Sequence, residues 1–151
     1  MTAVLLAVHV LAAIVFIGPV TVAASLFPRY ARQGEVGVAR MLHRISRVYA
    51  VLGLAVPVFG IATAAQMGVL GDAWLLVSIA LTAVAAALLA LLVVPDQRRL
   101  LAGSAEPVES VESAGPAALA RRLAATTGVF NLLWAVVVVL MIVRPGSSTG
   151  V

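Results

Sequence analysis

The chain has no cysteine and no lysine, and only 11% of its 151 residues are charged. The absence of cysteine excludes disulfides, thiolate metal sites and thiol chemistry. Hydrophobic residues, by contrast, make up 63% of the chain, and the mean hydropathy is +1.14. A soluble domain of this size cannot bury so much apolar surface. We therefore expect a single domain that is surrounded by the lipid bilayer.

Four apolar stretches approach or exceed the roughly 20 residues that a helix needs to cross a ~30 Å hydrocarbon core. We predict membrane spans at about residues 2–27, 45–67, 74–94 and 126–143. The connections between the first three spans are short, so consecutive spans should be antiparallel neighbours. The sequence thus predicts an all-α, polytopic membrane protein with an up-down four-helix transmembrane bundle.

Arginine indicates the orientation of the bundle. Nine of the ten arginines lie within residues 29–47 and 98–122, two segments that separate apolar stretches. The positive-inside rule places both segments in the cytoplasm and both chain termini outside, in a multi-pass protein of the cell inner (plasma) membrane. The same distribution explains the net charge of +4 without a nucleic-acid partner.

Two segments leave alternatives open. Residues 103–116 (GSAEPVESVESAGP) predict a flexible cytoplasmic linker, either solvated or attracted through its glutamates to the flanking arginines. The first apolar stretch ends in small residues, as a cleaved signal peptide does, but no basic segment precedes it and arginines follow it. We interpret it as a retained span with a kink at Gly18-Pro19, and we expect Pro95 to end the third span.

Small residues recur where helices could approach one another closely. Gly53 and Gly60 lie one heptad apart in the second span. The third span carries a row of four small residues at intervals of four: Ser78, Thr82, Ala86 and Ala90. Such rows let membrane helices pack at short distance. We predict that both sets are helix-packing faces.

His9 lies inside the first span, ~10 Å from its outer end at 1.5 Å per residue. Intramembrane ionisable residues are costly and often functional. Three interpretations stay open: a neutral structural imidazole bonded to Thr63 or Ser78, an axial ligand of haem b, or a proton relay. His43 is most of a bilayer away, so one protomer cannot place both histidines on one haem. A methionine, a water or His9 of a second copy would supply the second ligand.

Arg40, Arg44 and Arg47 share one helix face at the cytoplasmic start of the second span. Their long stems can reach lipid phosphates from that face. We expect them to bind membrane lipid headgroups, with anionic lipids as the favoured class. His43 is expected to join Arg40 and Arg44 at a headgroup or to face solvent.

Other polar residues give little support for catalysis. Asn131, with Thr126 and Thr127, makes the cytoplasmic half of the fourth span polar, and we expect interhelical hydrogen bonds from it. The sequence predicts no catalytic or metal site, because no acidic residue lies inside a span and no glycine-rich phosphate loop is present. Transport is poorly supported as well, because Asp72 and Asp96 both lie at span ends.

Several short motifs, in their order and spacing, resemble the small predicted bacterial integral membrane proteins called domain of unknown function 2269. They are Leu5 to Leu11 around His9, Gly18, Val93-Val94-Pro95 before an arginine pair, and Met141-Ile142-Val143-Arg144-Pro145. The resemblance covers about residues 4–145. A first-span histidine followed by a basic start of the second span is also remotely similar to the copper-resistance protein D family and to the membrane protoporphyrinogen oxidase family, which binds haem b. That similarity implies His9 as a haem ligand.

From these features we expect a non-enzymatic integral membrane protein that acts by helix packing. It would be a small accessory subunit of a larger membrane complex or a homo-oligomer. The alternative is a haem b binding redox membrane protein with His9 as axial ligand. The visible absorption spectrum of the purified protein distinguishes the two, because only the second predicts a reducible Soret band.

Overall fold

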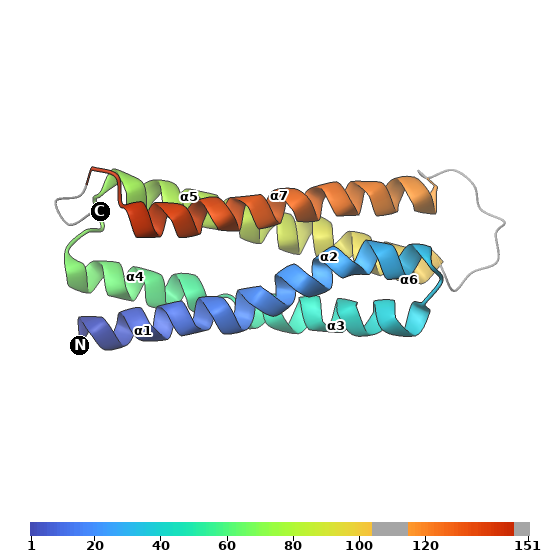
Figure 1. The fold of residues 1–151 in the computed structure, drawn as a ribbon, viewed down its shortest axis with the longest axis horizontal. Helices are drawn as coiled ribbons and strands as arrows, with labels where there is room; N and C mark the ends of the chain where they lie inside the picture. Colours follow the sequence, from blue (N-terminus) through green and yellow to red (C-terminus); the bar gives the residue numbers. More distant parts are fainter. Residues whose placement is uncertain (104–114, 147–151) are drawn as a thin grey trace.

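The structure is a computed structural model that describes residues 1–103 and 115–146. Within these residues the chain forms four long helical rods and no strand, and turns join the first three rods (Figure 1). Each rod is long and apolar enough to cross a membrane. The predicted all-α four-helix bundle is therefore confirmed. The linker predicted at 103–116 lies outside the described residues, except for its two ends.

Three of the rods contain more than one helical segment. The first rod comprises α1 (Thr2–Ala12), the π turn η1 (Ala13–Ile17) and α2 (Gly18–Arg32). The second comprises α3 (Val36–Leu52) and α4 (Ala55–Met67). The third comprises α5 (Ala73–Leu88), the π turn η2 (Leu89–Val93) and α6 (Val94–Gly103). The fourth rod is the single helix α7 (Pro116–Val143).

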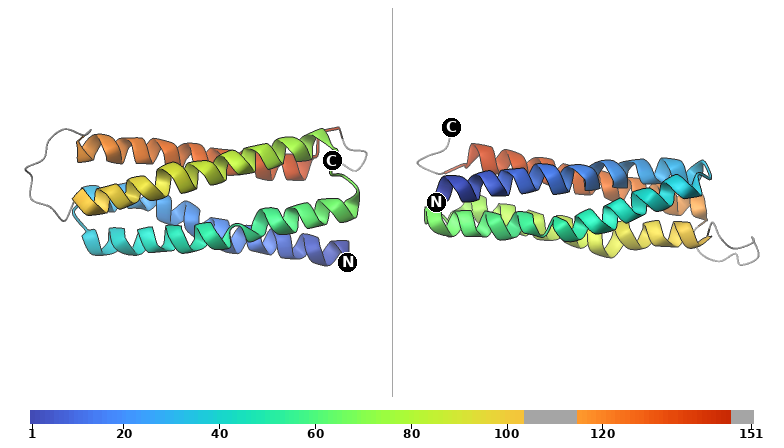
Figure 2. Two further views of the ribbon diagram at one scale, coloured as in Figure 1. Left: turned by 180° about the vertical axis from the view of Figure 1, so that it is seen from behind. Right: turned by 90° about the horizontal axis from the view of Figure 1, so that it is seen from below.

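The antiparallel rods define two ends of the bundle (Figure 2). The arginine-poor end, as we call it, holds the N-terminus, the turn over residues 68–72 and Arg144, which follows α7. The arginine-rich end holds the turn over residues 33–35, the end of α6 and the start of α7. The other nine arginines lie in the half of the bundle next to it. That this end is cytoplasmic remains our prediction from the positive-inside rule.

Each departure from α geometry lies shortly before a proline, although Pro28 lies within the continuous helix α2. The two π turns each end two residues before a proline, Pro19 and Pro95. Proline lacks the N–H that the carbonyl four residues earlier would accept, and its ring crowds that carbonyl, so the preceding turn widens. In the second rod the helix breaks at residues 53–54, shortly before Pro57. By contrast, α7 has no proline after its first residue and is continuous.

Two sequence predictions are revised by this geometry. The irregularity expected at Gly18-Pro19 lies one turn earlier, in η1. The expectation that Pro95 ends the third helix is wrong, because the helical rod continues through Pro95 to Gly103. The wider turn of η2 accommodates the proline ring without ending the rod. As a result, residues 96 and 97 lie within a helix rather than beyond it.

The core is larger in the arginine-rich half of the bundle. There, buried apolar side chains from all four rods pack together, and the bulkiest on three of them are Phe27, Leu42, Leu123 and Phe130. The arginine-poor half has a smaller buried cluster of Ala64, Trp74 and Leu75, packed against Val69 and Met141. Most other apolar side chains on the rods face outward, as expected for helices in contact with lipid.

Arg144 lies at the arginine-poor end of the bundle, directly after α7. It ends α7 in the left-handed conformation, with φ of 44°. Its guanidinium carbon lies 5.6 Å from the centre of the Trp74 ring, which is a cation–π contact. The Trp74 indole N–H donates a hydrogen bond of 3.0 Å to Asp72. The end of α7 is thereby attached to the start of α5.

Candidate functional site

His9 is half-buried on α1 and faces α4. Its Nδ1 lies 2.8 Å from the backbone carbonyl oxygen of Val56. Because a carbonyl oxygen only accepts, Nδ1 carries the proton in this hydrogen bond. In the neutral ring Nε2 is then left with a free lone pair, and a fixed Nδ1–H bond of this kind is how proteins orient a ligating histidine.

Gly60 lets the His9 ring lie against the α4 backbone. A Cβ atom placed on Gly60 would lie 2.8 Å from Cε1 of the His9 ring and 3.1 Å from its Nδ1. Only glycine therefore leaves room for the ring in this position. Both residues stand out in the sequence, but nothing in the sequence relates one to the other.

The predicted hydrogen-bond partners of His9 were wrong. Thr63 donates to the carbonyl of Phe59 at 2.7 Å, and Ser78 donates to the carbonyl of Trp74 at 2.8 Å. Both hydroxyls bond one turn back along their own helices, which is a common use of such residues in membrane helices. The partner of His9 is instead a main-chain oxygen. Every residue has such an oxygen, so the type of side chain in the sequence does not identify the partner.

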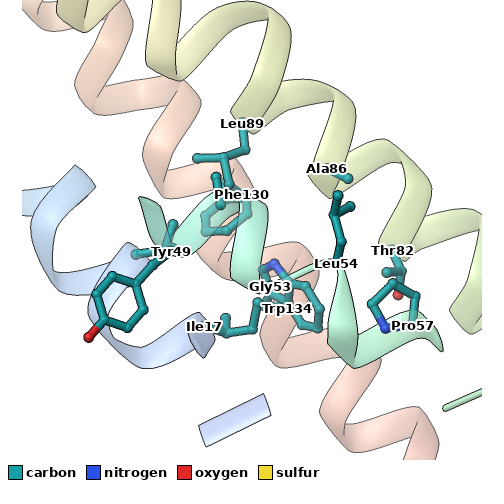
Figure 3. A pocket seen from close by; sticks show the side chains of 12 residues that line it. Ile17, Tyr49, Gly53, Leu54, Pro57, Thr82, Ala86, Leu89, Phe130 and Trp134 are labelled. Carbon is teal, nitrogen blue, oxygen red and sulfur yellow. The ribbon is translucent and has the colours of Figure 1, made fainter. Parts of the chain in front are cut away.

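A small cavity lies among the four rods, at the level of the two π turns and the break in the second rod (Figure 3). Its volume is about 40 Å³. Side chains from all four rods line it, including Ile17, Leu54, Leu89 and Trp134, and the lining is apolar. Apolar cavities stay dry. The cavity is far too small for a porphyrin, and His9 does not line it.

The arginine-rich half contains a buried carboxylate that the sequence analysis placed at a span end. Asp96 is fully buried in α6. Its Oδ1 accepts a hydrogen bond of 2.8 Å from Arg99, and its Oδ2 lies 3.3 Å from Nε of Arg122 on α7. Both arginine side chains are more than half exposed. Asp96 therefore joins α6 to α7 through an ion pair in which the carboxylate is buried and the arginine side chain is exposed.

Next to Asp96, Gln97 joins α6 to α3. Gln97 is fully buried, its Oε1 lies 3.0 Å from Nδ1 of His43, and its amide nitrogen donates a longer bond of 3.3 Å to Ser46. The expectation that His43 binds a headgroup or faces solvent stays a prediction, although its ring is half-buried and its Nδ1 lies against Gln97. His43 lies one turn from Ser46, and both are on the face of α3 that packs on α6.

The fourth rod carries polar groups in its interior, as predicted. Asn131 donates a hydrogen bond of 3.0 Å to Ser25 on α2, so the expected interhelical bond is confirmed. Thr126 instead bonds the carbonyl of Arg122 in its own helix. The Thr127 hydroxyl and the Trp134 indole N–H are buried without a hydrogen-bond partner among the described residues.

The predicted packing residues occupy two different environments. Gly53 is buried, and a Cβ on it would lie 3.3 Å from the Ile17 side chain, so this glycine faces the first rod. In the third rod Ser78 is buried and Thr82 is half-buried, whereas Ala86 and Ala90 are exposed. Residues at intervals of four are slightly more than one helical turn of 3.6 residues apart. Successive members of the row therefore rotate around the helix, from the core toward its outer surface.

The arginines of α3 lie on the surface of the bundle. Arg40, Arg44 and Arg47 are all exposed on α3 and make no ion pair among the described residues. Those residues also contain no group of three or more histidine, aspartate or glutamate side chains that could hold a metal ion. His9 is therefore the chemically distinctive residue inside the apolar part of the bundle.

Comparison with protein families matches residues 3–145 to the family described as "Predicted integral membrane protein (DUF2269)". No curated protein and no solved structure matches the chain.

Proposed function

We propose that this chain, which belongs to the DUF2269 family of predicted integral membrane proteins, is a non-enzymatic membrane protein that acts by packing against other helices. It would do so as a homo-oligomer or as a small accessory subunit of a larger membrane complex, in the cell inner membrane.

The observation that carries this proposal is an exposed strip of alanines on the third rod. We call it the alanine face, and it consists of Ala80, Ala83, Ala86, Ala87 and Ala90. Small side chains let a second helix approach closely, and close approach is what drives helix association in a bilayer. The strip continues the row that starts in the core at Ser78, and its Ala86 also lines the cavity among the rods.

We expect leucine at Ala87 and Ala90 to weaken assembly by about tenfold, or ~1.4 kcal/mol, because the added side chains separate the two helices. Native mass spectrometry and crosslinking in membranes measure the fraction of protein in complexes. Ala135→Leu, at an exposed alanine of α7, is the matched control. A chain that purifies alone as a monomer, or complexes that survive the double substitution unchanged, would contradict the proposal.

A second candidate function is haem b binding in a redox protein, with His9 as an axial ligand. It is supported by the Nδ1–H bond to Val56, which leaves Nε2 for a ligand. A haem would supply one-electron chemistry when bound. Since the interior cavity is too small, a macrocycle would lie against the outside of the bundle or between two copies. His9 would hold the iron through Nε2, and His9 of a second copy would supply the second ligand.

This candidate predicts a reducible Soret band in protein purified in mild detergent. The band should be lost in His9→Ala, because the axial ligand is removed, and kept in His43→Ala, because His43 bonds Gln97 far from His9. The measurement is the visible spectrum with and without dithionite. A colourless wild-type protein, or a band that survives in His9→Ala, would rule out this role for His9.

The exposed arginines on α3 support lipid as a further partner. At the membrane surface each arginine adds about 1 kcal/mol of attraction to anionic headgroups. We therefore expect glutamine at Arg40, Arg44 and Arg47 to reduce co-purified anionic lipid, measured by mass spectrometry of extracted lipid. Neutral lipid is the internal control, and an unchanged ratio of anionic to neutral lipid would contradict this prediction.

A further inference from the structure

The rods are interrupted at one common level of the bundle. The first rod is interrupted by η1, the second by the break at residues 53–54 and the third by η2. Ile17, Gly53 and Leu89 come from these three interruptions, and all three line the central cavity. Figure 3 shows these three residues around the same space. Non-α geometry thus coincides with a small cavity in the interior.

Packing on the two sides of this level is unequal. In the arginine-rich half, α2 packs on both α3 and α7, while α6 packs on α3 and α7, so all four rods are connected. In the arginine-poor half the closely packed pairs are α1 with α4 and α5 with α7. Among the described residues, no packing of similar extent joins one of these pairs to the other.

Only a few contacts join the α1–α4 pair to the α5–α7 pair among the described residues. They include the cluster of Ala64, Trp74 and Leu75 near the turn over residues 68–72. The large buried side chains of the main core all come from the other half or from the cavity level. Few buried apolar contacts mean a low cost of local opening.

From these three observations we infer that the bundle has a hinge at the cavity, about which the α1–α4 pair moves relative to the α5–α7 pair. The interruptions in the first and second rods supply the bending points, because a π turn or a proline-associated break has lost part of the regular hydrogen-bond ladder. The cavity supplies the space into which side chains shift. The continuous helix α7 and the arginine-rich half form the fixed part. The contact between His9 and Gly60 lies within the moving pair, so it is kept during the motion.

Distances between spin labels in lipid nanodiscs test this inference, and the absence of native cysteine simplifies the labelling. Labels at Val4→Cys and Val139→Cys report across the two pairs in the arginine-poor half. Labels at Met41→Cys and Ala125→Cys report across the fixed half, and all four sites are exposed. We expect the first distribution to be roughly twofold wider than the second, as hinge motion predicts. Labels at Val4→Cys and Ile61→Cys, within the moving pair, should give a narrow distribution.

Alanine at Pro19 and Pro57 should narrow the distribution across the two pairs, because each substitution restores a helical N–H. Val20 lines the cavity and is fully buried, and Val20→Ile adds a methylene group there. This substitution leaves the prolines in place, and it should also narrow the distance distribution across the two pairs. A wild-type distribution across the pairs that is as narrow as that of the fixed half would overturn the hinge. A wide distribution that neither set of substitutions narrows would overturn the assignment of the hinge to the cavity level.

Discussion

Replacing both Arg99 and Arg122 with glutamine is expected to destabilise the bundle by about 3 kcal/mol, because it leaves the buried Asp96 charge without a partner. Asp96 is fully buried, so water cannot solvate the carboxylate in place of the two guanidinium groups. The arginine side chains are 63% and 54% exposed, and solvent screening places the effect at the lower end of the range known for broken buried pairs.

Thermal unfolding in detergent, followed by circular dichroism, measures this loss. Glutamine at Arg98 and Arg121 is the matched control, because it removes the same net charge from neighbouring positions that make no ion pair with any residue that the structure describes. Adding Asp96→Asn to the Arg99 and Arg122 double variant should restore most of the stability. Equal losses in the two double variants would show that Asp96 does not depend on these partners.

Gly60→Ala is the second substitution with a large expected effect, a loss of about 2 kcal/mol. The new methyl group would lie 2.8 Å from the His9 ring, so the ring has to move and its hydrogen bond to Val56 is lost. In most helices a glycine-to-alanine change is favourable, by up to about 1 kcal/mol. The sign of the effect at Gly60 is therefore a direct measure of the contact with His9.

A double-mutant cycle separates this contact from other effects of Gly60→Ala. His9→Ala removes the ring, so in that background Gly60→Ala should cost little or become stabilising. Gly128→Ala on α7 is the control, because a Cβ there meets no atom within 4 Å. If Gly60→Ala is as harmless as Gly128→Ala, or if its cost is the same with and without His9, the close contact is absent in solution.

Both predictions concern residues that the sequence analysis had noted without finding their partners. Asp96 was placed at a span end because Pro95 was expected to end the helix, and the π turn of η2 instead carries the rod onward. The distinguishing sequence signal was weak: a polar pair, Asp96-Gln97, between apolar residues and an arginine pair. Burial of that pair depends on α3 and α7, which are distant in the sequence.

The sequence by itself determined that the chain lies in a membrane, that it is all-α and that it forms four rods. These features follow from hydropathy and length, which are local properties of each apolar stretch. It also placed the departures from α geometry near prolines, since the missing N–H acts within one turn. Only the tertiary structure decided the partners: Val56 and Gly60 for His9, Gln97 for His43, and two arginines for Asp96. Those pairings depend on the rotation and register of neighbouring rods. In a chain where most apolar side chains face lipid, hydrophobicity constrains rotation and register only weakly.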